Sequence, residues 1–460
     1  MTMYAIAHTA TITDITSHAD FSREFRMFGN RNMYLGRGFS WALSSNIVYS
    51  ISQWAYVVVL AKLGTPADLG AYALGLAIST PVLMFANFQG RNFVASDVNN
   101  QCSFGEHLAF RITCFGIALG ILSVGLMLAH SSPAQAAIVL LVGLGQALDY
   151  VSETYFGVLQ RYERLDRVSL SLMVKGPLGL LLMTSAMLIS HNVLLAVAAL
   201  VGGRCAVLCL MDTRNLKAIA GPYHLVWNRG SQWKLLGAAF PLGIISSLGA
   251  ANLNMPRYFV EADLGKTELG LFSALASAVG AGNLVIAALA SCSMVSLAKA
   301  WANRNRTAYW SLCLRLLAVS GLVGAAGVIV SILVGKDVLV VLFKPEYAKN
   351  SDVFVRVMIS AAIGYVVSAQ GYALTAARKL VAQIPILAAS TVVAALCSWY
   401  LVPKYGLKGA ADVWIIGSVF QLICSSQLLR KMNAGLTAEA SAESMPGVGF
   451  GAETTTEGLS

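Results

Sequence analysis

Long apolar segments, separated by short polar connections, run along most of the chain. A helix needs about 20 mostly apolar residues to cross the hydrocarbon core of a bilayer. By this measure the pattern predicts twelve membrane-spanning helices, at residues 39–61, 70–93, 109–130, 135–159, 168–190, 193–212, 235–258, 269–297, 311–335, 354–376, 381–402 and 409–429.

A short motif occurs in two of the polar connections. Residues 63–72 read LGTPADLGAY and residues 264–272 read LGKTELGLF, so the two match with a one-residue gap. Each copy lies between two apolar runs, as a tight helix–helix connection does. We expect the glycines to allow tight turns and the acid to cap the following helix. Repetition at this spacing indicates a chain built from two similar halves.

The repeat divides the chain into two lobes of six helices each. Because the first and seventh helices start on the same side, the lobes form a parallel repeat.

The N-terminus, which is poor in apolar residues, has no compact hydrophobic segment of the kind found in signal peptides. The expected divisions are a cytoplasmic tail at 1–38, a lobe at 39–212, a cytoplasmic linker at 213–234, a second lobe at 235–430 and a disordered cytoplasmic tail at 431–460.

The composition supports an all-α, polytopic membrane protein. Of the 460 residues, 57% are hydrophobic and only 12% are charged, against about 25% charged in soluble proteins. The net charge of +10 is typical of Lys and Arg kept on the cytoplasmic side, and it does not by itself indicate nucleic-acid binding.

The distribution of these cations tests the topology. With the N-terminus inside, twenty of the 32 Lys and Arg fall in inner segments, seven in outer loops and five within spans. This asymmetry predicts that both termini are cytoplasmic.

Five cations fall within predicted spans, where a charge at the bilayer centre costs at least about 2.5–3.5 kcal/mol. Lys175 and Arg204 lie deepest, ~12 Å and ~18 Å from a membrane surface at 1.5 Å per residue. We expect them either to face a lobe interior or to form structural ion pairs. Arg257, Arg315 and Arg356 lie nearer helix ends and could extend to the interface.

Two acids lie on one face of the fourth helix. Asp149 and Glu153 are four residues apart, and Glu153 lies at a depth similar to that of Lys175. A Glu153–Lys175 ion pair is therefore possible. Alternatively, the two carboxylates could bind a proton or Na⁺ and couple it to transport, because their mutual repulsion favours neutralisation.

Signals for chemistry are absent. No Gly-x4-Gly-Lys-Ser/Thr motif is present for ATP binding. Cys205 and Cys209 are four residues apart without a nearby His, so they indicate helix packing and not a metal site. Outer loops are too short for an enzyme domain. We therefore predict no catalytic residue, no metal site and no cofactor.

Four stretches, at residues 60–72, 263–273, 343–347 and 401–411, resemble corresponding loops of one family. The family that these stretches resemble is that of the Wzx-type polysaccharide and O-antigen flippases of the multidrug/oligosaccharidyl-lipid/polysaccharide (MOP) exporter superfamily. With the twelve-helix plan, the resemblance covers about residues 35–430.

The resemblance implies a flippase of the bacterial inner membrane that moves a polyprenyl-diphosphate-linked oligosaccharide for exopolysaccharide or O-antigen synthesis. Membrane lipids, a polysaccharide polymerase and export proteins are the implied partners, and nucleic acid is not. The family's cavity is lined mainly by helices one, two, seven and eight, and is often cationic. On those helices the chain carries Arg91 and Arg257, which join Lys175 and Arg204 as candidate substrate-binding residues.

Other functions stay open. A drug or cation exporter of the same superfamily would favour acidic cavity residues, and a lipid II-type flippase would share the fold. A polysaccharide polymerase, ligase or membrane glycosyltransferase would need catalytic side chains in an outer loop. The loop after the second helix lacks the Gly-x3-Asp pattern usual in the major facilitator family.

Overall fold

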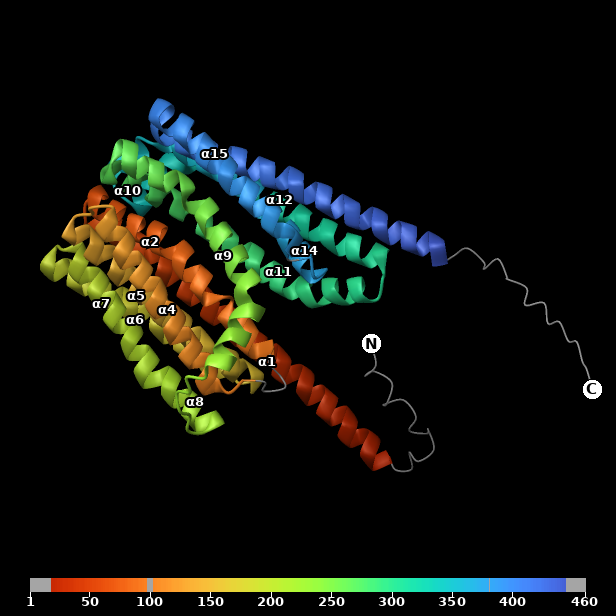
Figure 1. Cartoon of the computed structure of the whole chain (residues 1–460). Coiled ribbons are helices and arrows are strands. Elements are labelled where there is room, and N and C mark those ends of the chain that lie inside the picture. The colour runs from red at the N-terminus through yellow and green to blue at the C-terminus, as the bar shows by residue number, and fades with distance from the viewer. Residues whose placement is uncertain (1–17, 97–101, 380, 444–460) are drawn as a thin grey trace, which may run out of the picture.

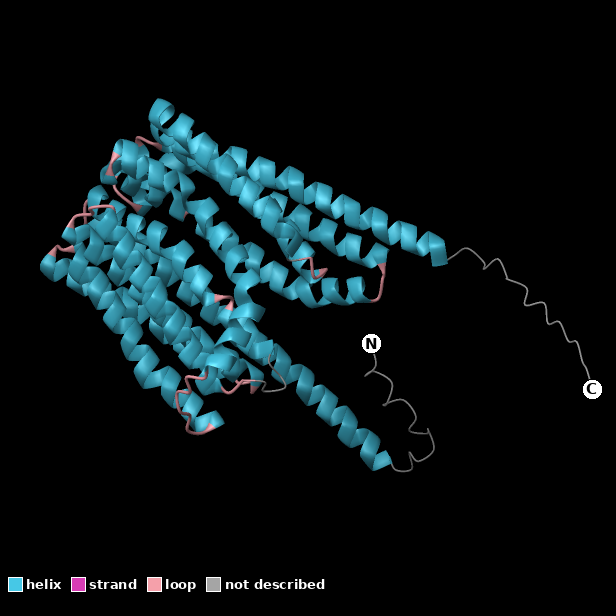
Figure 2. Ribbon diagram, in the orientation of Figure 1, coloured by secondary structure: helices cyan, strands magenta, loops and turns pink. Residues whose placement is uncertain are grey.

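A computed structural model describes residues 18–96, 102–379 and 381–443, which are helical almost throughout (Figures 1 and 2). The N-terminal lobe contains α1 (His18–Leu63), α2 (Pro66–Asn87), α3 (Gly90–Ser96), α4 (Phe104–Leu128), α5 (Pro133–Arg161), α6 (Leu165–Ser190) and α7 (Val193–Val207). A π-helical turn, Leu208–Asp212, leads from α7 into α8 (Thr213–Ala220).

The C-terminal lobe repeats this plan. It contains α9 (Arg229–Leu264), α10 (Lys266–Ser277), α11 (Val279–Ala302), α12 (Arg306–Leu342), α13 (Pro345–Ala348), α14 (Ser351–Ala376), a 3₁₀ turn (Val381–Gln383) and α15 (Ile384–Glu443). Inside α15 the backbone of Gly406 has φ 59° and ψ −137°, so α15 consists of two helices joined at a break. A left-handed φ of this kind favours glycine.

The prediction of twelve spans in an all-helical, two-lobe protein is confirmed. By length and apolarity alone, nine helices of the described chain could cross a membrane, or ten when α10 and α11 count as one bent span. Dividing α15 at Gly406 and including α1, which packs along α6, completes the set of twelve. The exact lobe and tail boundaries stay predictions, with α1 beginning at His18 and α15 continuing to Glu443.

Capping residues explain where several spans begin. Thr65 precedes α2, and its hydroxyl accepts a hydrogen bond from the Asp68 amide at 3.2 Å while the Asp68 carboxylate accepts one from the Thr65 amide at 2.9 Å. Ser103 and Glu106 form the same reciprocal box at the start of α4. Each box satisfies amides that have no partner within the helix. The acid in the first copy of the repeated motif therefore caps its helix, as predicted.

The two copies of the repeated motif contact each other across the lobe boundary. A Cβ atom on Gly70 of α2 would lie 1.9 Å from the carbonyl oxygen of Lys266, and one on Gly270 of α10 would lie 1.8 Å from the carbonyl oxygen of Pro66. Both glycines lie inside helices, so the expectation that they form turns is wrong for this pair. They allow α2 and α10 to cross with their backbones in contact.

Further contacts hold the lobes together near this crossing. The Lys344 ammonium donates to the Gly64 carbonyl at 2.6 Å, and the Tyr258 hydroxyl donates to the Ala77 carbonyl at 2.5 Å. Leu69 and Phe272 are fully buried in one apolar cluster that includes residues of both lobes. In Figure 1 the lobes lie together at the end where α10 is labelled and separate toward the end where α1 begins and α15 ends.

We predict that Gly270→Ala or Gly70→Ala pushes the lobes apart at this crossing. The added Cβ would lie 1.8–1.9 Å from a backbone carbonyl oxygen of the other helix, and the two atoms must move apart by about 2 Å to reach normal contact. Spin labels at Lys62 and Thr267, in a variant otherwise free of cysteine, should report a longer distance by double electron–electron resonance.

The matched control is Gly237→Ala on α9, where a Cβ meets no heavy atom within 4 Å. It should leave the distance distribution as in the parent protein. An unchanged distribution in both the Gly70 and Gly270 variants would show that this crossing does not hold the lobes together.

Candidate functional site

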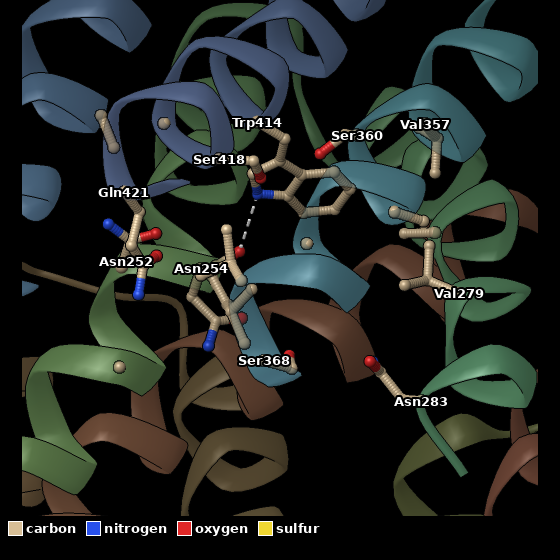
Figure 3. Close-up of a pocket in the computed structure, with 18 of the residues that line it drawn as sticks. Asn252, Asn254, Val279, Asn283, Val357, Ser360, Ser368, Trp414, Ser418 and Gln421 are labelled. Carbon is tan, nitrogen blue, oxygen red and sulfur yellow. Dashed lines mark hydrogen bonds between the residues drawn. The ribbon is translucent and has the colours of Figure 1, made fainter. Parts of the chain in front are cut away.

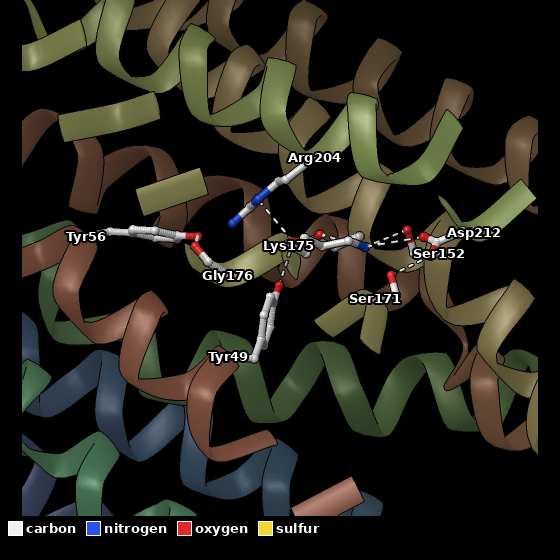
Figure 4. Close-up of polar contacts among 9 residues, drawn as sticks. Tyr49, Tyr56, Ser152, Ser171, Lys175, Gly176, Arg204 and Asp212 are labelled. Carbon is white, nitrogen blue, oxygen red and sulfur yellow. Dashed lines mark hydrogen bonds and ion pairs between the residues drawn. The ribbon is translucent and has the colours of Figure 1, made fainter. Parts of the chain in front are cut away.

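Four charged side chains meet inside the N-terminal lobe, and we call them the ion cluster: Asp149, Lys175, Arg204 and Asp212. The Lys175 ammonium lies 3.6 Å from Asp149 Oδ1 and 3.7 Å from Asp212 Oδ2, and Arg204 Nη1 lies 3.1 Å from Asp149 Oδ2. They come from α5, α6, α7 and the π-helical turn (Figure 4). Two acids and two bases balance in formal charge, which allows burial at this depth.

Hydroxyl groups form hydrogen bonds with Lys175 and with one oxygen of each acid, whereas the other oxygen of each acid lies near the Lys175 ammonium and has no hydrogen-bond partner among the described residues. Lys175 donates to Ser152 Oγ at 2.6 Å, and Ser171 Oγ donates to Asp212 Oδ1 at 2.5 Å. The Tyr49 hydroxyl of α1 donates to Asp149 Oδ2 at 3.1 Å (Figure 4). Helical spacing explains the pairing, since Ser171 and Lys175 are four residues apart on one face of α6. The ion cluster therefore joins α1, α5, α6 and α7.

The π-helical turn gives Asp212 its position. Its side chain is completely buried, and that of Lys175 is 2% exposed. A π-helical turn adds one residue to a helical turn and often occurs at functional positions. Asp212 was not among the candidate residues, because it ends an apolar run and is typical of an interfacial residue. The only signal in the sequence was that Asp212 is an acidic residue at the end of a predicted span, where it could pair with a buried cation such as Lys175.

The predicted Glu153–Lys175 ion pair is not formed. Lys175 pairs with Asp149 and Asp212 instead, while Glu153 Oε2 accepts a hydrogen bond from the Asn87 amide at 3.2 Å. Asp149 and Glu153 share a face of α5 but lie one turn apart, so they reach different neighbours.

A pocket of about 300 Å³ opens beside the ion cluster. Asp149, Glu153 and Arg204 line it, together with tyrosines and apolar residues of α1, α2, α5 and α7. Glu153 forms no ion pair with any residue that the structure describes. This N-lobe pocket thus offers one carboxylate that no cation neutralises.

A larger cavity of about 630 Å³ lies mainly in the C-terminal lobe, between α9, α10, α11, α14 and α15 (Figure 3). Leu76 and Thr80 of α2 line both this C-lobe cavity and the N-lobe pocket. The two spaces therefore meet at α2, on the boundary between the lobes.

The four candidate cations separate into three environments. Lys175 and Arg204 are committed to the ion cluster. Arg257 lines the C-lobe cavity, where its Nη1 donates to Asn254 Oδ1 at 2.9 Å and its Nε has no hydrogen-bond partner. Arg91 of α3 lies apart from both spaces and donates to Gln160 at 3.1 Å. Only Arg257 is thus placed to meet a ligand in the larger cavity.

The C-lobe cavity also contains side chains that were not among the candidate residues. Its polar lining is composed of amides and hydroxyls, including Asn252, Asn283, Ser418 and Gln421, with Trp414 beside them. Uncharged polar residues scattered over five helices give no local pattern in a sequence. No group of three or more His, Cys, Asp or Glu side chains arranged for a metal ion occurs within the described ranges.

No protein-family model matches the chain. A relative, the capsular polysaccharide biosynthesis protein CapF of Staphylococcus aureus, is 24% identical over 390 residues, which cover 84% of this chain and 97% of the relative.

The structure is similar to that of the lipid II flippase MurJ in an inward closed conformation, with a TM-score of 0.69 and 12% identity, covering 88% of this chain and 90% of that one. It is also similar to the inward-facing conformation of a multidrug resistance MATE family transporter, with a TM-score of 0.64 and 15% identity, covering 85% and 96%. Both similar structures are transporters. The chain is a multi-pass membrane protein with the two-lobe fold of the MOP superfamily transporters.

Proposed function

We propose that the protein flips a polyprenyl-diphosphate-linked oligosaccharide across the bacterial inner membrane for polysaccharide export. The observation that carries this proposal is the C-lobe cavity, which reaches the lobe boundary at α2 in a fold shared with a lipid II flippase. The sequence similarity to a capsular polysaccharide biosynthesis protein supports a glycan as the cargo.

The lobe contacts fit alternating access. The Gly70–Gly270 crossing closes the end of the molecule that the charge distribution assigns to the outside. Rocking of the lobes about such a contact would expose the cavity to one side at a time. In this proposal both termini are cytoplasmic, and the substrate enters from the inner leaflet.

Arg257 is the residue that we propose to bind the carrier diphosphate. Its guanidinium lines the C-lobe cavity with an unpartnered Nε, and Arg forms bidentate hydrogen bonds to phosphate oxygens. Lys175 and Arg204, by contrast, serve the ion cluster. We therefore assign these two residues a structural role in the N-terminal lobe.

We further propose that the N-lobe pocket couples an ion gradient to transport. Glu153 is the freest acid there, because Asp149 already faces Lys175 and Arg204. A proton or Na⁺ bound at Glu153 would neutralise a carboxylate within the membrane, which favours the liganded state. The same pocket also supports the second candidate function, export of an organic cation.

The first test measures flipping in proteoliposomes. A lipid-linked oligosaccharide with a fluorophore on its sugar should become accessible to an impermeant quencher faster than in protein-free vesicles. Arg257→Gln should slow flipping by about 10- to 100-fold, because a hydrogen bond to a charged group contributes roughly 1.5–3 kcal/mol. The exposed Arg315 provides the control, and Arg315→Gln should transport normally. Wild-type vesicles no faster than empty ones would contradict the flippase proposal.

The second test distinguishes a role in ion coupling from a role in the stability of the protein. Glu153→Gln should fold normally and remove the dependence of the flipping rate on an imposed proton or Na⁺ gradient. Asp149→Asn should lower the temperature of unfolding in detergent, because breaking a buried ion network costs about 3–5 kcal/mol. A Glu153→Gln protein with the wild-type gradient dependence would exclude Glu153 as the coupling group.

A further inference from the structure

The lining of the C-lobe cavity is polar but almost uncharged. Among the described residues that line it, Arg257 is the only Lys, Arg, Asp or Glu. A cavity without a carboxylate does not suit an organic cation, and its single arginine leaves no counter-charge for anionic groups beyond those of the carrier diphosphate. The ligand that fits most of this surface is therefore polar and uncharged.

Two of the amides that line the cavity are available to such a ligand. Neither Asn283 nor Gln421 hydrogen-bonds to any described residue, although both line the cavity. In Figure 3 Gln421 and Asn252 lie on one side of the view and Asn283 lies on the other. Each amide offers two donors and a carbonyl acceptor, which match the paired hydroxyl groups of a sugar ring.

Trp414 adds an apolar face that is held in a fixed orientation. Its indole nitrogen donates to the Leu253 carbonyl at 3.1 Å, and its ring packs against Phe272 with centroids 4.7 Å apart. The Arg257 guanidinium carbon lies 5.9 Å from the Trp414 ring centroid. An oriented aromatic ring suits the apolar C–H face of a sugar, and the nearby guanidinium suits an adjacent phosphate.

We propose that the C-lobe cavity is a binding site for uncharged sugar units, with amides on both sides, Trp414 against one sugar face and Arg257 at the phosphate to which the sugar is attached. The site rests on the proposed flippase function and specifies its substrate class. The N-lobe pocket takes no part in sugar binding, because its charged groups are engaged in the ion cluster or serve the coupling ion.

The test measures binding of synthetic polyprenyl diphosphates to the purified full-length protein. Three probes carry N-acetylglucosamine, glucuronic acid or no sugar. The wild-type protein should bind the N-acetylglucosamine probe at least about tenfold more tightly than the other two, as expected for a few hydrogen bonds.

The variants locate this preference. The pair Gln421→Ala and Asn283→Ala, and separately Trp414→Leu, should lose most of the preference while binding the bare lipid as the wild type does. Arg257→Gln should weaken all three probes. The control is Gln370→Ala, an amide on α14 that donates to Ser426 and does not line the cavity; this variant should keep the preference.

Two outcomes would overturn the inference and leave the flippase function intact. One is active flipping with an unchanged sugar preference in the cavity variants, and the other is tighter binding of the glucuronic acid probe. If the wild-type protein neither binds nor flips any of the three lipids, the proposed function fails together with the sugar site.

Discussion

The contact between Gly70 and Gly270 is the constraint on which the arrangement of the two lobes depends. Backbone meets backbone there because neither position has a side chain. Small residues allow helices in a membrane to approach closely. Close packing then drives helix association, because in lipid the hydrophobic effect does not bring helices together. The angle at which α2 and α10 leave this point, together with the contacts between α2 and α9, shapes the space between the lobes.

The lobes repeat in topology but differ in chemistry. The N-terminal lobe has a balanced group of buried charges that joins four helices. The C-terminal lobe has a wide cavity whose lining includes a single charged residue, Arg257. Separating the partners of the charge group in the N-terminal lobe would leave a buried charge uncompensated, which keeps these helices together, whereas a cavity with one charged residue can exchange its contents at lower electrostatic cost.

The sequence predicts the fold better than the site. Apolar runs and the repeated motif were sufficient for the helices and lobes, since the bilayer imposes a minimum span length. The sequence showed one span at 269–297, where the structure has α10 and α11 with an axis bent by 45°. A run of small and apolar residues does not encode such a bend.

The burial of Lys175 and Arg204 could also be expected from the sequence, but their partners could not. Which side chains meet depends on the rotation of each helix and on local features such as the π-helical turn that carries Asp212. The cavity amides are a stronger case, because residues as distant as Asn252 and Gln421 converge only through tertiary packing.

One short segment of α2 has a further consequence. Leu76 and Thr80 are at once a wall of the N-lobe pocket and a wall of the C-lobe cavity. Two ligands divided by so thin a partition cannot be thermodynamically independent if either one shifts it. If the proposed ion and sugar sites are both correct, any gain in sugar affinity on ion binding must then equal the gain in ion affinity on sugar binding. A single turn of α2 would thus couple binding of the driving ion to binding of the cargo.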